Sequence, residues 1–498
     1  MFKKVLIANR GEIAVRIIRA ARELGIETIS IYHEADKNSP FVHLADYAYK
    51  LEADIPRKAY LDIEQIINIA KQSEAEAIHP GYGFLSENAD FAQSVTQAGL
   101  VFIGPPAFAI EAMGSKTKAR ELMYNAAVPI VPGTQSAIDD IGIAKQYCQS
   151  IGYPVLLKAS AGGGGKGMRI VRNPDDFESE LESAAREALK AFGNSSVYIE
   201  KYIEEPKHIE IQIIADNHGN YVHLGERDCS IQRRHQKIIE EAPSTVLTPE
   251  LRNQMGEVAL NAARAVGYTN AGTVEFLLDK DKNFYFLEMN TRLQVEHPVT
   301  ERITGLDLAK EQILIAAGNK LSFTQEQVTL RGHSIECRIY AEDPFNGFLP
   351  DTGKINYLRE PGGKGIRIDS GVEIGTEVSI HFDPMLAKLI VLGKDRNEAI
   401  DRMIQALKAY TVKGIKTSIP FELAVMEHPV FRSGNYNTGF LEKVFDFASL
   451  AKFKEVHEEI VAAIATYGFV KAKMAKTPVV KLERTDSKWK TVARYRDR

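Results

Sequence analysis

The chain has 498 residues, 44% of them apolar and 26% charged, with a formal net charge of −4. This composition is typical of a soluble globular protein, and the length predicts about three domains instead of one core. The charge balance argues against nucleic-acid or membrane binding, and no run reaches ~18 apolar residues. The start, MFKKVLIANRGE, turns polar after a short apolar run, so neither a membrane span nor a signal peptide is expected.

Residues 1–113 alternate between strand and helix patterns. KKVLIANRGEIAVRIIRAARELGIETISIYHEAD predicts a strand, a turn, an amphipathic helix that stops at Gly25, and a second strand. The apolar face of that helix consists of Ile13, Ile17, Ile18, Ala21 and Leu24. AEAIHPGYGFLSEN and LVFIGPP continue the alternation, which predicts a parallel α/β domain.

A glycine run, GGGGKG at 162–167, lies between two apolar strand patterns in the second region. It matches G-x-G-x-x-G, but a strand pattern follows it where a dinucleotide fingerprint opens a helix. It is not a Walker loop either, because Ser160 replaces the first glycine and Gly167 follows Lys166. Its bare N–H groups can close over phosphate oxygens, and the alternative is a plain surface hairpin.

Four lysines could complete such a phosphate site: Lys116, Lys158, Lys201 and Lys237. Each could equally be an ordinary surface residue. The same alternative applies to His208 and His235, which could be structural histidines.

Two further segments, Thr273–Asp279 and Phe284–Asn290, are predicted strands joined by a four-residue loop. In a symmetric hairpin the paired residue numbers sum to 563, which places Glu275 opposite Glu288. Carboxylates roughly 5 Å apart repel by about 3 kcal/mol at an effective dielectric of 20.

A divalent cation would remove this repulsion. The all-oxygen set Glu275, Glu288 and Asn290 suits Mg²⁺ or Mn²⁺. The alternative is a solvated hairpin face with a tolerated acidic pair, and a one-residue bulge would break the register.

The polar pattern continues through FYFLEMNTRLQVEHP, from Phe284 to Pro298. If this segment is extended, alternate side chains share a face. The polar row would then contain Glu288, Asn290, Arg292, Gln294 and Glu296.

Beyond about residue 330, HSIECRIYAED, KINYLREP and GIRIDSGV predict a third, β-rich unit closed by a helix at 397–410. Residues 446–498 are predicted to be helical and then a basic tail. Positions 471–498 hold ten Lys or Arg against three Asp or Glu. The tail is either a poorly ordered terminus or a docking segment for an acidic partner.

Ten motifs occur in one order over residues 1–445: ANRGEIAVRI, HPGYGFLSEN, GSK, KASAGGGGKGMRIV, IEKYI, GERDCSIQRRHQKIIEEAP, GTVEF, FLEMNTRLQVEHPVTE, IECRIYAEDP and HFDPMLAKLIV. Together they resemble biotin carboxylase, an ATP-grasp enzyme. The resemblance implies ATP-dependent carboxylation of biotin by bicarbonate through carboxyphosphate. It also implies a Rossmann-like domain at 1–113, an ATP-grasp domain at 114–325 with a mobile lid at 132–203, and a β-rich C-terminal domain at 330–445.

The resemblance also implies residue roles. It gives Glu275, Glu288 and Asn290 as metal ligands, with Glu275 and Glu288 also contacting ATP. The other positions implied to hold the nucleotide are Lys116, Lys158, Gly164, Gly165, Glu200, Lys201, Tyr202, Ile203, His208, Gln232 and His235. Glu296 would be the general base, and bicarbonate would bind Lys237, Arg292, Gln294, Glu296 and the backbone of Val295.

Arg338 would stabilise the biotin enolate; its alternative is an ion pair with Glu336 on the sheet surface. Departures from the family pattern are Ala161, Lys166, His381 and Phe382, and none removes a ligand or the base.

The chain lacks a biotin-acceptor motif; KAKMAK at 471–476 has Ala472 where methionine is expected before Lys473. Biotin is therefore expected on a separate biotin carboxyl carrier protein, with carboxyl transfer on a further carboxyltransferase subunit. The chain would be a homodimeric subunit of an acetyl-CoA, propionyl-CoA or pyruvate carboxylase, and FLPDTGKI favours an acyl-CoA. Three cysteines without CxxC spacing fit a reducing cytoplasm.

Other functions make different demands on the sequence. Another ATP-grasp ligase, joining a carboxylate to an amine, would share the metal hairpin but would not need the EMNTRLQVEH row or Arg338. A non-catalytic nucleotide-binding scaffold would be expected to have lost Glu296 or a metal ligand, and all are present.

Overall fold

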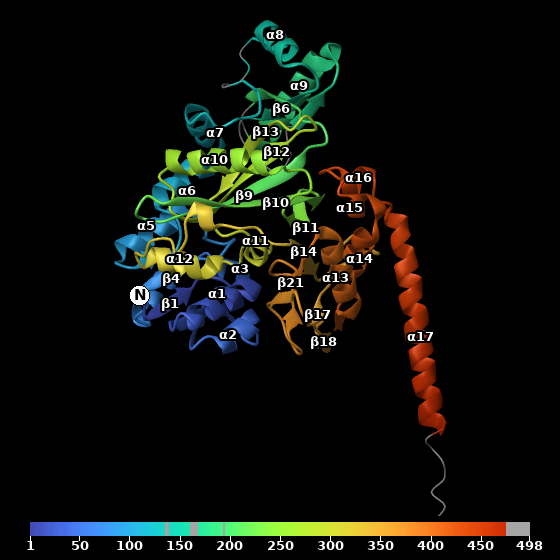
Figure 1. The fold of residues 1–498 in the computed structure, drawn as a ribbon. Coiled ribbons are helices and arrows are strands. Elements are labelled where there is room, and N and C mark those ends of the chain that lie inside the picture. The colour runs from blue at the N-terminus through green and yellow to red at the C-terminus, as the bar shows by residue number, and fades with distance from the viewer. Residues whose placement is uncertain (135–137, 139, 160–167, 193–194, 475–498) are drawn as a thin grey trace, which may run out of the picture. The chain divides into compact units, whose positions relative to one another are not determined.

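The computed structural model describes residues 1–134, 138, 140–159, 168–192 and 195–474, which fall into two compact units, Met1–Asp446 and Phe447–Arg498 (Figure 1). Gly164, Gly165 and the basic residues after 474 lie outside the described residues, as does the side chain of Lys116. Within the described ranges, every helix is too short or too polar to cross a bilayer.

The first region contains a five-stranded parallel sheet in the order β3-β2-β1-β4-β5, which confirms the predicted parallel α/β domain. The strands are β1 Lys4–Ile7, β2 Glu27–His33, β3 Tyr47–Leu51, β4 Ala77–His79 and β5 Val101–Phe102. The helices are α1 Gly11–Glu23, α2 Pro40–Leu44, α3 Pro56–Ala59, α4 Ile63–Gln72, α5 Ala89–Gln97, α6 Ala107–Gly114 and α7 Lys116–Asn125. The predicted face of α1 is buried at Ile13, Ile17 and Ile18, and Gly25 follows the helix with φ of 74°.

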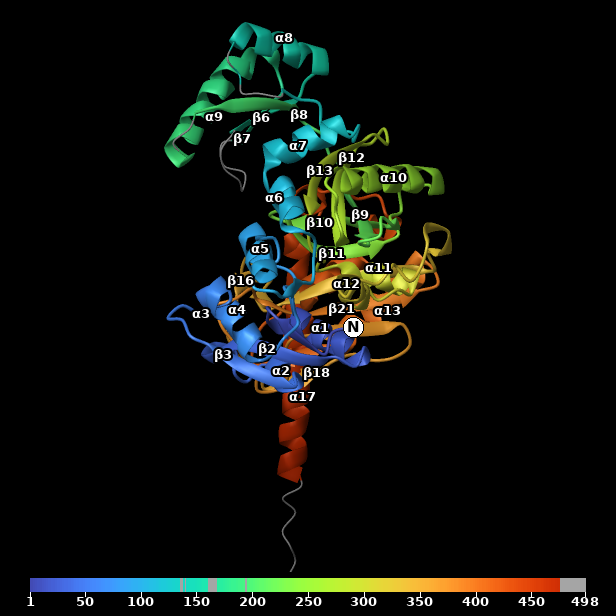
Figure 2. The same cartoon turned by 90° about the vertical axis from the view of Figure 1, so that its left-hand side faces the viewer.

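A small unit with its own apolar core follows, at one end of Met1–Asp446 (Figure 2). Its antiparallel sheet has the order β7-β6-β8 and is covered by two helices. The elements are α8 Ile141–Ile151, β6 Val155–Ala159, β7 Met168–Val171, α9 Phe177–Phe192 and β8 Val197–Lys201. The strand predicted after the glycine run is therefore confirmed as β7, which excludes the dinucleotide fingerprint.

The centre of the molecule is an antiparallel sheet of eight strands in the order β13-β12-β9-β10-β11-β14-β21-β19. The strands are β9 Lys207–Ala215, β10 Tyr221–Arg233, β11 Gln236–Ala242, β12 Asn270–Leu278, β13 Phe284–Asn290, β14 His333–Tyr340, β19 Ile366–Ser370 and β21 Met385–Gly393. Strands β14, β19 and β21 come from the predicted β-rich third unit, and the structure adds that they are not a separate sheet. They continue the same sheet, because β14 pairs directly with β11.

Three short strand pairs and eight further helices complete the described parts of the two units. The remaining strand pairs are β15 Glu342–Asp343 with β16 Leu349–Pro350, β17 Gly353–Lys354 with β20 Glu377–Val378, and β18 Tyr357–Arg359 with β22 Thr411–Lys413. The remaining helices are α10 Pro249–Ala265, α11 His297–Thr304, α12 Leu308–Ala316, α13 Arg396–Ala409, α14 Ile419–Glu427, α15 Pro429–Ser433, α16 Phe440–Lys443 and α17 Ala451–Met474. Helix α13 confirms the predicted closing helix to within one residue at each end.

The central sheet separates an apolar face from a polar one. In β9 the sequence alternates, so Ile209, Ile211 and Ile213 pack in one core with residues of α10. The residues between them, Glu210 and Gln212, face the other way, toward α11. In Figure 1, α10 and α11 lie on opposite sides of these strands. Glu210 and Gln212 are therefore fully buried beneath a helix.

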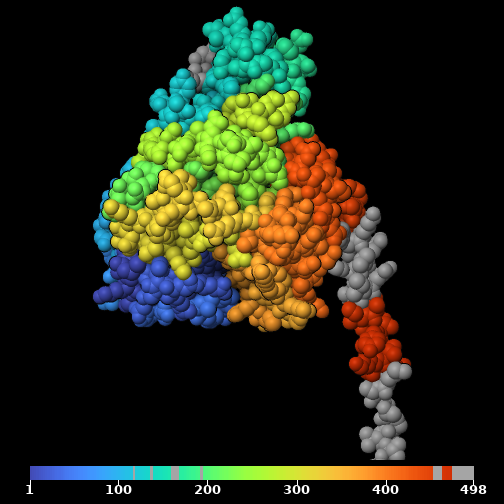
Figure 3. All heavy atoms as spheres, viewed as in Figure 1, coloured from blue at the N-terminus to red at the C-terminus, as the bar shows by residue number. Residues whose placement is uncertain are grey.

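The first and last parts of Met1–Asp446 are in direct contact. Their surfaces adjoin in Figure 3, where the blue N-terminal atoms lie beside the orange ones. A Cβ placed at Gly371, just after β19, would lie 2.5 Å from the backbone nitrogen of Glu12 in α1. Only a hydrogen atom fits between these two backbones.

We therefore expect Gly371→Ala to destabilise the protein by about 1–3 kcal/mol, because an extra methyl group in a packed contact forces a backbone shift. Denaturant unfolding measures this difference. Gly362→Ala is the matched control, since a Cβ there has no atom within 4 Å and should leave the stability unchanged. Equal stability of the two variants would contradict the close packing.

Candidate active site

The hairpin of β12 and β13 places two carboxylates opposite each other. Glu275 pairs with Glu288, which confirms the predicted pairing. The register near the loop differs from the predicted one. Phe276 pairs with Phe286 there, so the paired residue numbers sum to 562 instead of 563. A one-residue irregularity after Glu275 changes the register and brings the two carboxylates together.

The extended polar row is confirmed only as far as Asn290, where β13 ends. Residues 291–296 turn, and Glu296 is the N-cap residue of α11. The predicted strand Phe284–Asn290 is therefore confirmed, but the condition that the row stays extended to Glu296 is not met. The turn still brings Gln294 back to the hairpin, where its Nε2 donates to Glu275 Oε1 at 3.0 Å.

Lys237 on β11 is the cation at the centre of the polar face. Its Nζ lies 2.5 Å from Glu210 Oε2, 2.8 Å from Glu275 Oε1 and 2.7 Å from Glu296 Oε1. Burial alone would lower the pKa of Lys237, but the three carboxylates outweigh it and raise the pKa well above its usual value. One ammonium thus joins strands β9, β11 and β12 to the start of α11.

Arg227 forms a second layer under this cluster and was not predicted from the sequence. It is fully buried and pairs with Glu210. It also donates to Gln212 Oε1 at 2.6 Å and to the hydroxyls of Thr273 and Thr300 at 3.0 Å. The alternation HIEIQI, with polar residues at every second position between isoleucines, is the signal that could have identified Glu210 and Gln212.

Glu296 is fully buried between two cations. Its Oε1 accepts from Lys237, and its Oε2 lies 2.9 Å from Arg338 Nη2. Burial by itself would raise the pKa of Glu296, but Lys237, Arg338 and Arg227 hold this pKa well below its ordinary value. Glu296 is therefore a carboxylate at neutral pH.

Arg338 on β14 connects Glu296 to a further buried acid. Its Nε donates to Glu240 Oε1 at 2.6 Å, whereas the carboxylate oxygens of Glu336, on the same strand, have no hydrogen-bond partner among the described residues. The alternative of a surface pair between Arg338 and Glu336 is therefore wrong. Glu240 lies on β11, opposite Glu336 in the ladder, and burial raises its pKa to about 7 although Arg338 opposes the rise.

Arg292 borders the open side of the site. It donates to Glu87 Oε2 at 2.7 Å, to Asn290 Oδ1 at 2.8 Å and to Gln294 Oε1 at 3.3 Å. The backbone carbonyl of Val295 accepts a hydrogen bond from Lys388 Nζ at 2.9 Å, which anchors the turn of residues 291–296 to β21. Arg292, Gln294, Val295, Glu296 and Lys237 are thus brought together, as predicted for an anion site.

The predicted nucleotide positions fall into two groups. His208 lies with the cluster, since its Nε2 is 2.7 Å from Glu275 Oε2 and its Nδ1 is 2.9 Å from Gln232 Nε2. His235 is exposed in the two-residue turn between β10 and β11, with φ of 67°.

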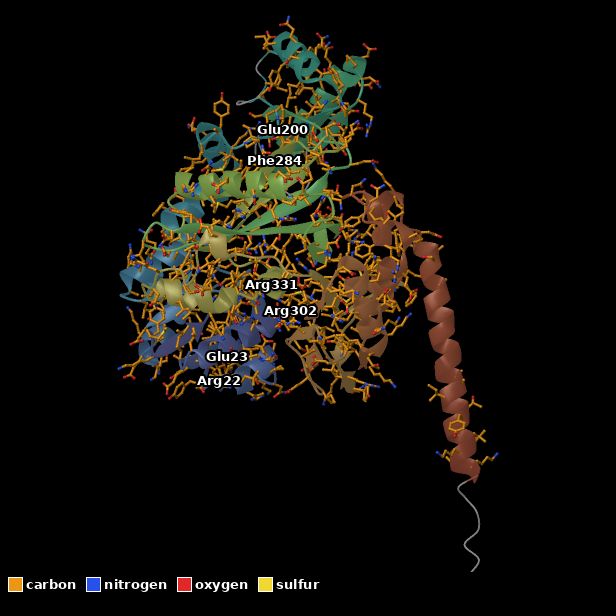
Figure 4. All side chains as sticks on the ribbon, viewed as in Figure 1. Arg22, Glu23, Glu200, Phe284, Arg302 and Arg331 are labelled. Carbon is orange, nitrogen blue, oxygen red and sulfur yellow. The ribbon has the colours of Figure 1, made fainter. Side chains whose placement is uncertain are left out.

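The second group lies on the small sheet, where Lys158 of β6 pairs with Glu200 of β8, and Arg120 also reaches Glu200 at 3.1 Å. Figure 4 labels Glu200 there and Phe284 at the start of β13. Lys201 instead directs its Nζ to the carbonyls of Gly152 and Tyr153, so its ammonium supports a loop. Tyr202, the first residue after β8, donates its backbone N–H to the carbonyl of Pro154, and Ile203 is the next residue.

The donor set at the hairpin fits a hard divalent cation. The side chain of Glu288 is exposed and has no hydrogen bond or ion pair with the described residues, although Glu288 lies opposite the buried Glu275 in the ladder. Asn290 now donates to Glu275 and accepts from Arg292, so its amide would have to release Arg292 to become a ligand. Carboxylate and amide oxygens of this kind suit Mg²⁺ or Mn²⁺.

A parallel α/β domain, a small glycine-containing unit and an antiparallel sheet with buried carboxylates and lysines define an ATP-grasp ligase. Residues 1–110 match "Biotin carboxylase, N-terminal domain", residues 115–324 match "Carbamoyl-phosphate synthase L chain, ATP binding domain", and residues 336–443 match "Biotin carboxylase C-terminal domain". The chain belongs to the biotin carboxylase family.

Similar proteins cover most of the chain. Biotin carboxylase 1 of Bacillus subtilis is 54% identical over 443 residues, which is 89% of this chain and 98% of that protein. The 2-oxoglutarate carboxylase small subunit of Hydrogenobacter thermophilus is 50% identical over 470 residues, 94% of this chain and 99% of that protein. A crystal structure of the biotin carboxylase domain dimer of the Hydrogenobacter enzyme, with MgADP, ADP and bicarbonate, has a TM-score of 0.82, 51% identity, and coverage of 89% and 98%.

The central role of Lys237 gives a test of stability. Replacing one partner of a buried ion pair leaves uncompensated charge and typically costs about 3–5 kcal/mol. We expect Lys237→Met to lose stability on this scale in denaturant unfolding at about pH 8. Lys443→Met, which removes an exposed pair with Glu205, should change the stability by less than about 1 kcal/mol.

The loss should also depend on pH. With Lys237 present, the lowered pKa values of Glu275 and Glu296 contribute stability above the unfolded pKa of about 4.3, and this contribution disappears as the pH falls through the folded values. Without Lys237, burial is opposed only by His208 at Glu275 and by Arg338 and Arg227 at Glu296, so both pKa values rise and the folded state takes up protons at a higher pH than the wild-type protein does. The deficit should therefore be larger at about pH 8 than at about pH 5.5, and a constant deficit would contradict the charge argument.

Proposed function

We propose that this chain carboxylates biotin on a separate carrier protein, using bicarbonate and ATP through carboxyphosphate. The observation that carries the proposal is Glu296, a buried carboxylate held between Lys237 and Arg338 and next to the open Glu288 hairpin. A base, two cations and a metal-type donor set thus lie on one polar face.

Glu275, Glu288 and Asn290 would hold Mg²⁺ or Mn²⁺, which supplies charge neutralisation for the phosphates of ATP. His208, Gln232 and His235 would line the nucleotide site from the central sheet. Lys116, Lys158, Gly164, Gly165 and the segment from Glu200 through Lys201 and Tyr202 to Ile203 would contribute from the small unit. Release of Lys158 from Glu200 would free its ammonium for a phosphate oxygen.

Bicarbonate would bind Lys237, Arg292, Gln294 and the backbone of Val295, with Glu296 as its general base. In the structure without bicarbonate, Lys237 and Arg338 keep the pKa of Glu296 low, so its carboxylate is ionised but weakly basic. An anion that takes over the ammonium of Lys237 would raise that pKa and make proton removal from bicarbonate easier. Attack of the bicarbonate oxygen on the γ-phosphate of ATP would then form carboxyphosphate and release ADP as the leaving group.

Carboxyphosphate yields CO₂ and phosphate, and the phosphate takes the N1′ proton of biotin. Arg338 would stabilise the enolate so that the nitrogen attacks CO₂. Positive charge directed at developing negative charge is where most rate acceleration is expected. Glu240 holds the other side of the Arg338 guanidinium and keeps it beside Glu296.

Further parts of the proposal concern organisation. We assign residues 1–113, 114–325 and 330–445 to the three domains of the family, with 132–203 as a lid that closes over ATP, and 446–498 to a C-terminal extension. A homodimer is proposed because the Hydrogenobacter structure contains a dimer of this domain. The biotin carboxyl carrier protein and the carboxyltransferase would be separate subunits, in a cytoplasmic enzyme whose three cysteines are all free and buried.

For the final carboxyl acceptor we propose an acyl-CoA, as FLPDTGKI suggests, which would serve fatty acid synthesis if it is acetyl-CoA. A 2-oxo acid is the second candidate. The 94% of this chain that aligns with the 2-oxoglutarate carboxylase small subunit is about 468 residues and must extend past Asp446. The 89% that aligns with Biotin carboxylase 1 need not extend past that residue.

The base is tested with Glu296→Gln. This variant should bind ATP normally and lose bicarbonate-dependent ATP cleavage by at least about 100-fold, the scale for removing a positioned base. Phosphate release with free biotin and bicarbonate is the measurement. Glu360→Gln, at an exposed position outside the site, is the control, and turnover near the wild-type rate in Glu296→Gln would show that the proton goes elsewhere.

The metal site is tested by thermal shift. Because Glu275 and Glu288 face each other, Mg²⁺ with ATP should raise the melting temperature of the wild-type protein. Glu288→Gln should weaken MgATP binding strongly and lose most of this shift, with Glu360→Gln again unchanged. A melting-temperature shift in Glu288→Gln equal to that of the wild-type protein would contradict the assignment of Glu275 and Glu288 as metal ligands.

A further inference from the structure

Helix α17 carries an apolar pattern that the enzyme core does not use. Its apolar residues recur at alternating spacings of three and four, the a and d positions of a heptad repeat. These positions are Phe453, Val456, Ile460, Ala463, Tyr467, Val470 and Met474. We call this set the α17 seam, and Pro478 follows it four residues later.

The described side chains of the seam are open to solvent. Tyr467 is 67% exposed and Val470 is 45% exposed. Ile464, beside the seam, is 65% exposed. Most helical stability in proteins comes from packing of an amphipathic face and not from intrinsic helix propensity. The seam therefore requires a second apolar surface, and a 3–4 spacing is specific for another helix.

The flanking charges identify the kind of helix. Positions e and g of the repeat, which face a partner helix, hold three lysines and one glutamate. They are Lys452, His457, Glu459, Ile464, Thr466, Lys471 and Lys473. Lys471 and Lys473 also begin the segment 471–498 with its ten basic residues against three acidic ones. A complementary helix carries acidic residues at its own e and g positions.

A second copy of α17 does not meet this requirement. In a parallel pair, g residues face e residues, and the pairs would be Lys452 with His457, Glu459 with Ile464, and Thr466 with Lys471. In an antiparallel pair, g residues face g residues, which sets Lys452 near Lys473. Neither orientation brings opposite charges together, so the seam is not built for self-association.

Comparison with relatives also separates this segment from the enzyme core. About 468 residues of this chain align with a protein named as a small subunit, and at least about 22 of them lie beyond Asp446. Biotin carboxylase 1 aligns over 443 residues and almost its whole length. Part of the second unit is thus shared with a subunit of a larger assembly.

We propose that the α17 seam docks an amphipathic helix with acidic flanks on the partner polypeptide that carries biotin. The inference rests on the proposed function, since biotin must reach Glu296 and Arg338 from another chain. Tethering the carrier through α17 would raise its effective concentration at the active site without altering the chemistry. Basic residues after the seam would add electrostatic attraction that salt weakens.

Two variants of the full chain test the seam. The seam variant Tyr467→Glu/Val470→Glu places two charges at a and d positions, using a residue that forms helices well. The matched control Ala465→Glu/Ala472→Glu adds the same charge at the exposed f positions on the opposite side of the repeat. Both keep residues 1–446 unchanged, so each should carboxylate free biotin at the wild-type rate.

The first probe is a labelled peptide of about four heptads with Leu at a and d and Glu at e and g, compared with the same peptide carrying Lys at e and g. The full chain should bind the Glu peptide at least about tenfold more tightly than the Lys peptide, and more weakly at high salt. The seam variant should lose this binding and the control should keep it. Equal binding of the two peptides would overturn the acidic-helix assignment.

The second probe is the partner itself, detected through its biotin. The tagged chain, expressed in its own host, should retain a polypeptide that streptavidin detects; the seam variant should lose it and the control should not. Retention by the seam variant, together with normal carboxylation of free biotin, would overturn the inference and leave the proposed function intact. If no form of the chain carboxylates free biotin, the proposed function itself fails.

Two other surfaces could cover the seam: a second copy of α17, or another part of the same chain. Sedimentation and thermal melting of the wild-type protein and both variants test these two possibilities. A fall in oligomer mass confined to the seam variant would show that α17 pairs with a second copy. A lowered melting temperature confined to the seam variant would show that α17 packs on its own chain. Either result would overturn docking of a partner helix; the expected result is no change in mass or melting temperature.

Discussion

The arrangement of the site depends on one buried ammonium group. Lys237 contacts Glu210, Glu275 and Glu296, which come from two strands and the start of a helix that are far apart in sequence. Without this cation, three buried carboxylates would repel one another in a medium where charges are poorly screened. The same contacts keep Glu296 ionised and out of water, and they link the metal-type hairpin to the base. Stability and function thus share one interaction.

The continuity of the central sheet makes this arrangement possible. Strand β11 pairs with β10 on one side and β14 on the other, so Lys237 and Arg338 reach the same face from strands a hundred residues apart in the chain. Two separate sheets would leave Arg338 and Glu240 without a fixed position relative to Glu296. The close backbone contact at Gly371 then fixes the far edge of the sheet against α1.

Charge distribution also distinguishes the two units. In the first unit the functional cations are matched by buried acids, which is costly to assemble but gives fixed geometry. In the second unit, the described part of α17 leaves apolar side chains exposed with lysines beside them. The first pattern suits reaction of a small anion, and the second suits recognition of another polypeptide.

Much of this protein followed from the sequence because local patterns carry it. Strand and helix periodicity predicted the parallel domain, helix α13 and the strand after the glycine run, and the motif order predicted the family. The pairing of Glu275 with Glu288 was also predicted, although it arises from a register irregularity that residue spacing does not reveal. Three features depended on long-range contacts: the turn at residues 291–296, the single eight-stranded sheet, and the partners of Arg338. Alternation in HIEIQI indicates polar residues on one face, but only the tertiary structure decides that Arg227 and Lys237 neutralise them, because charges that meet across strands have no signature in sequence spacing.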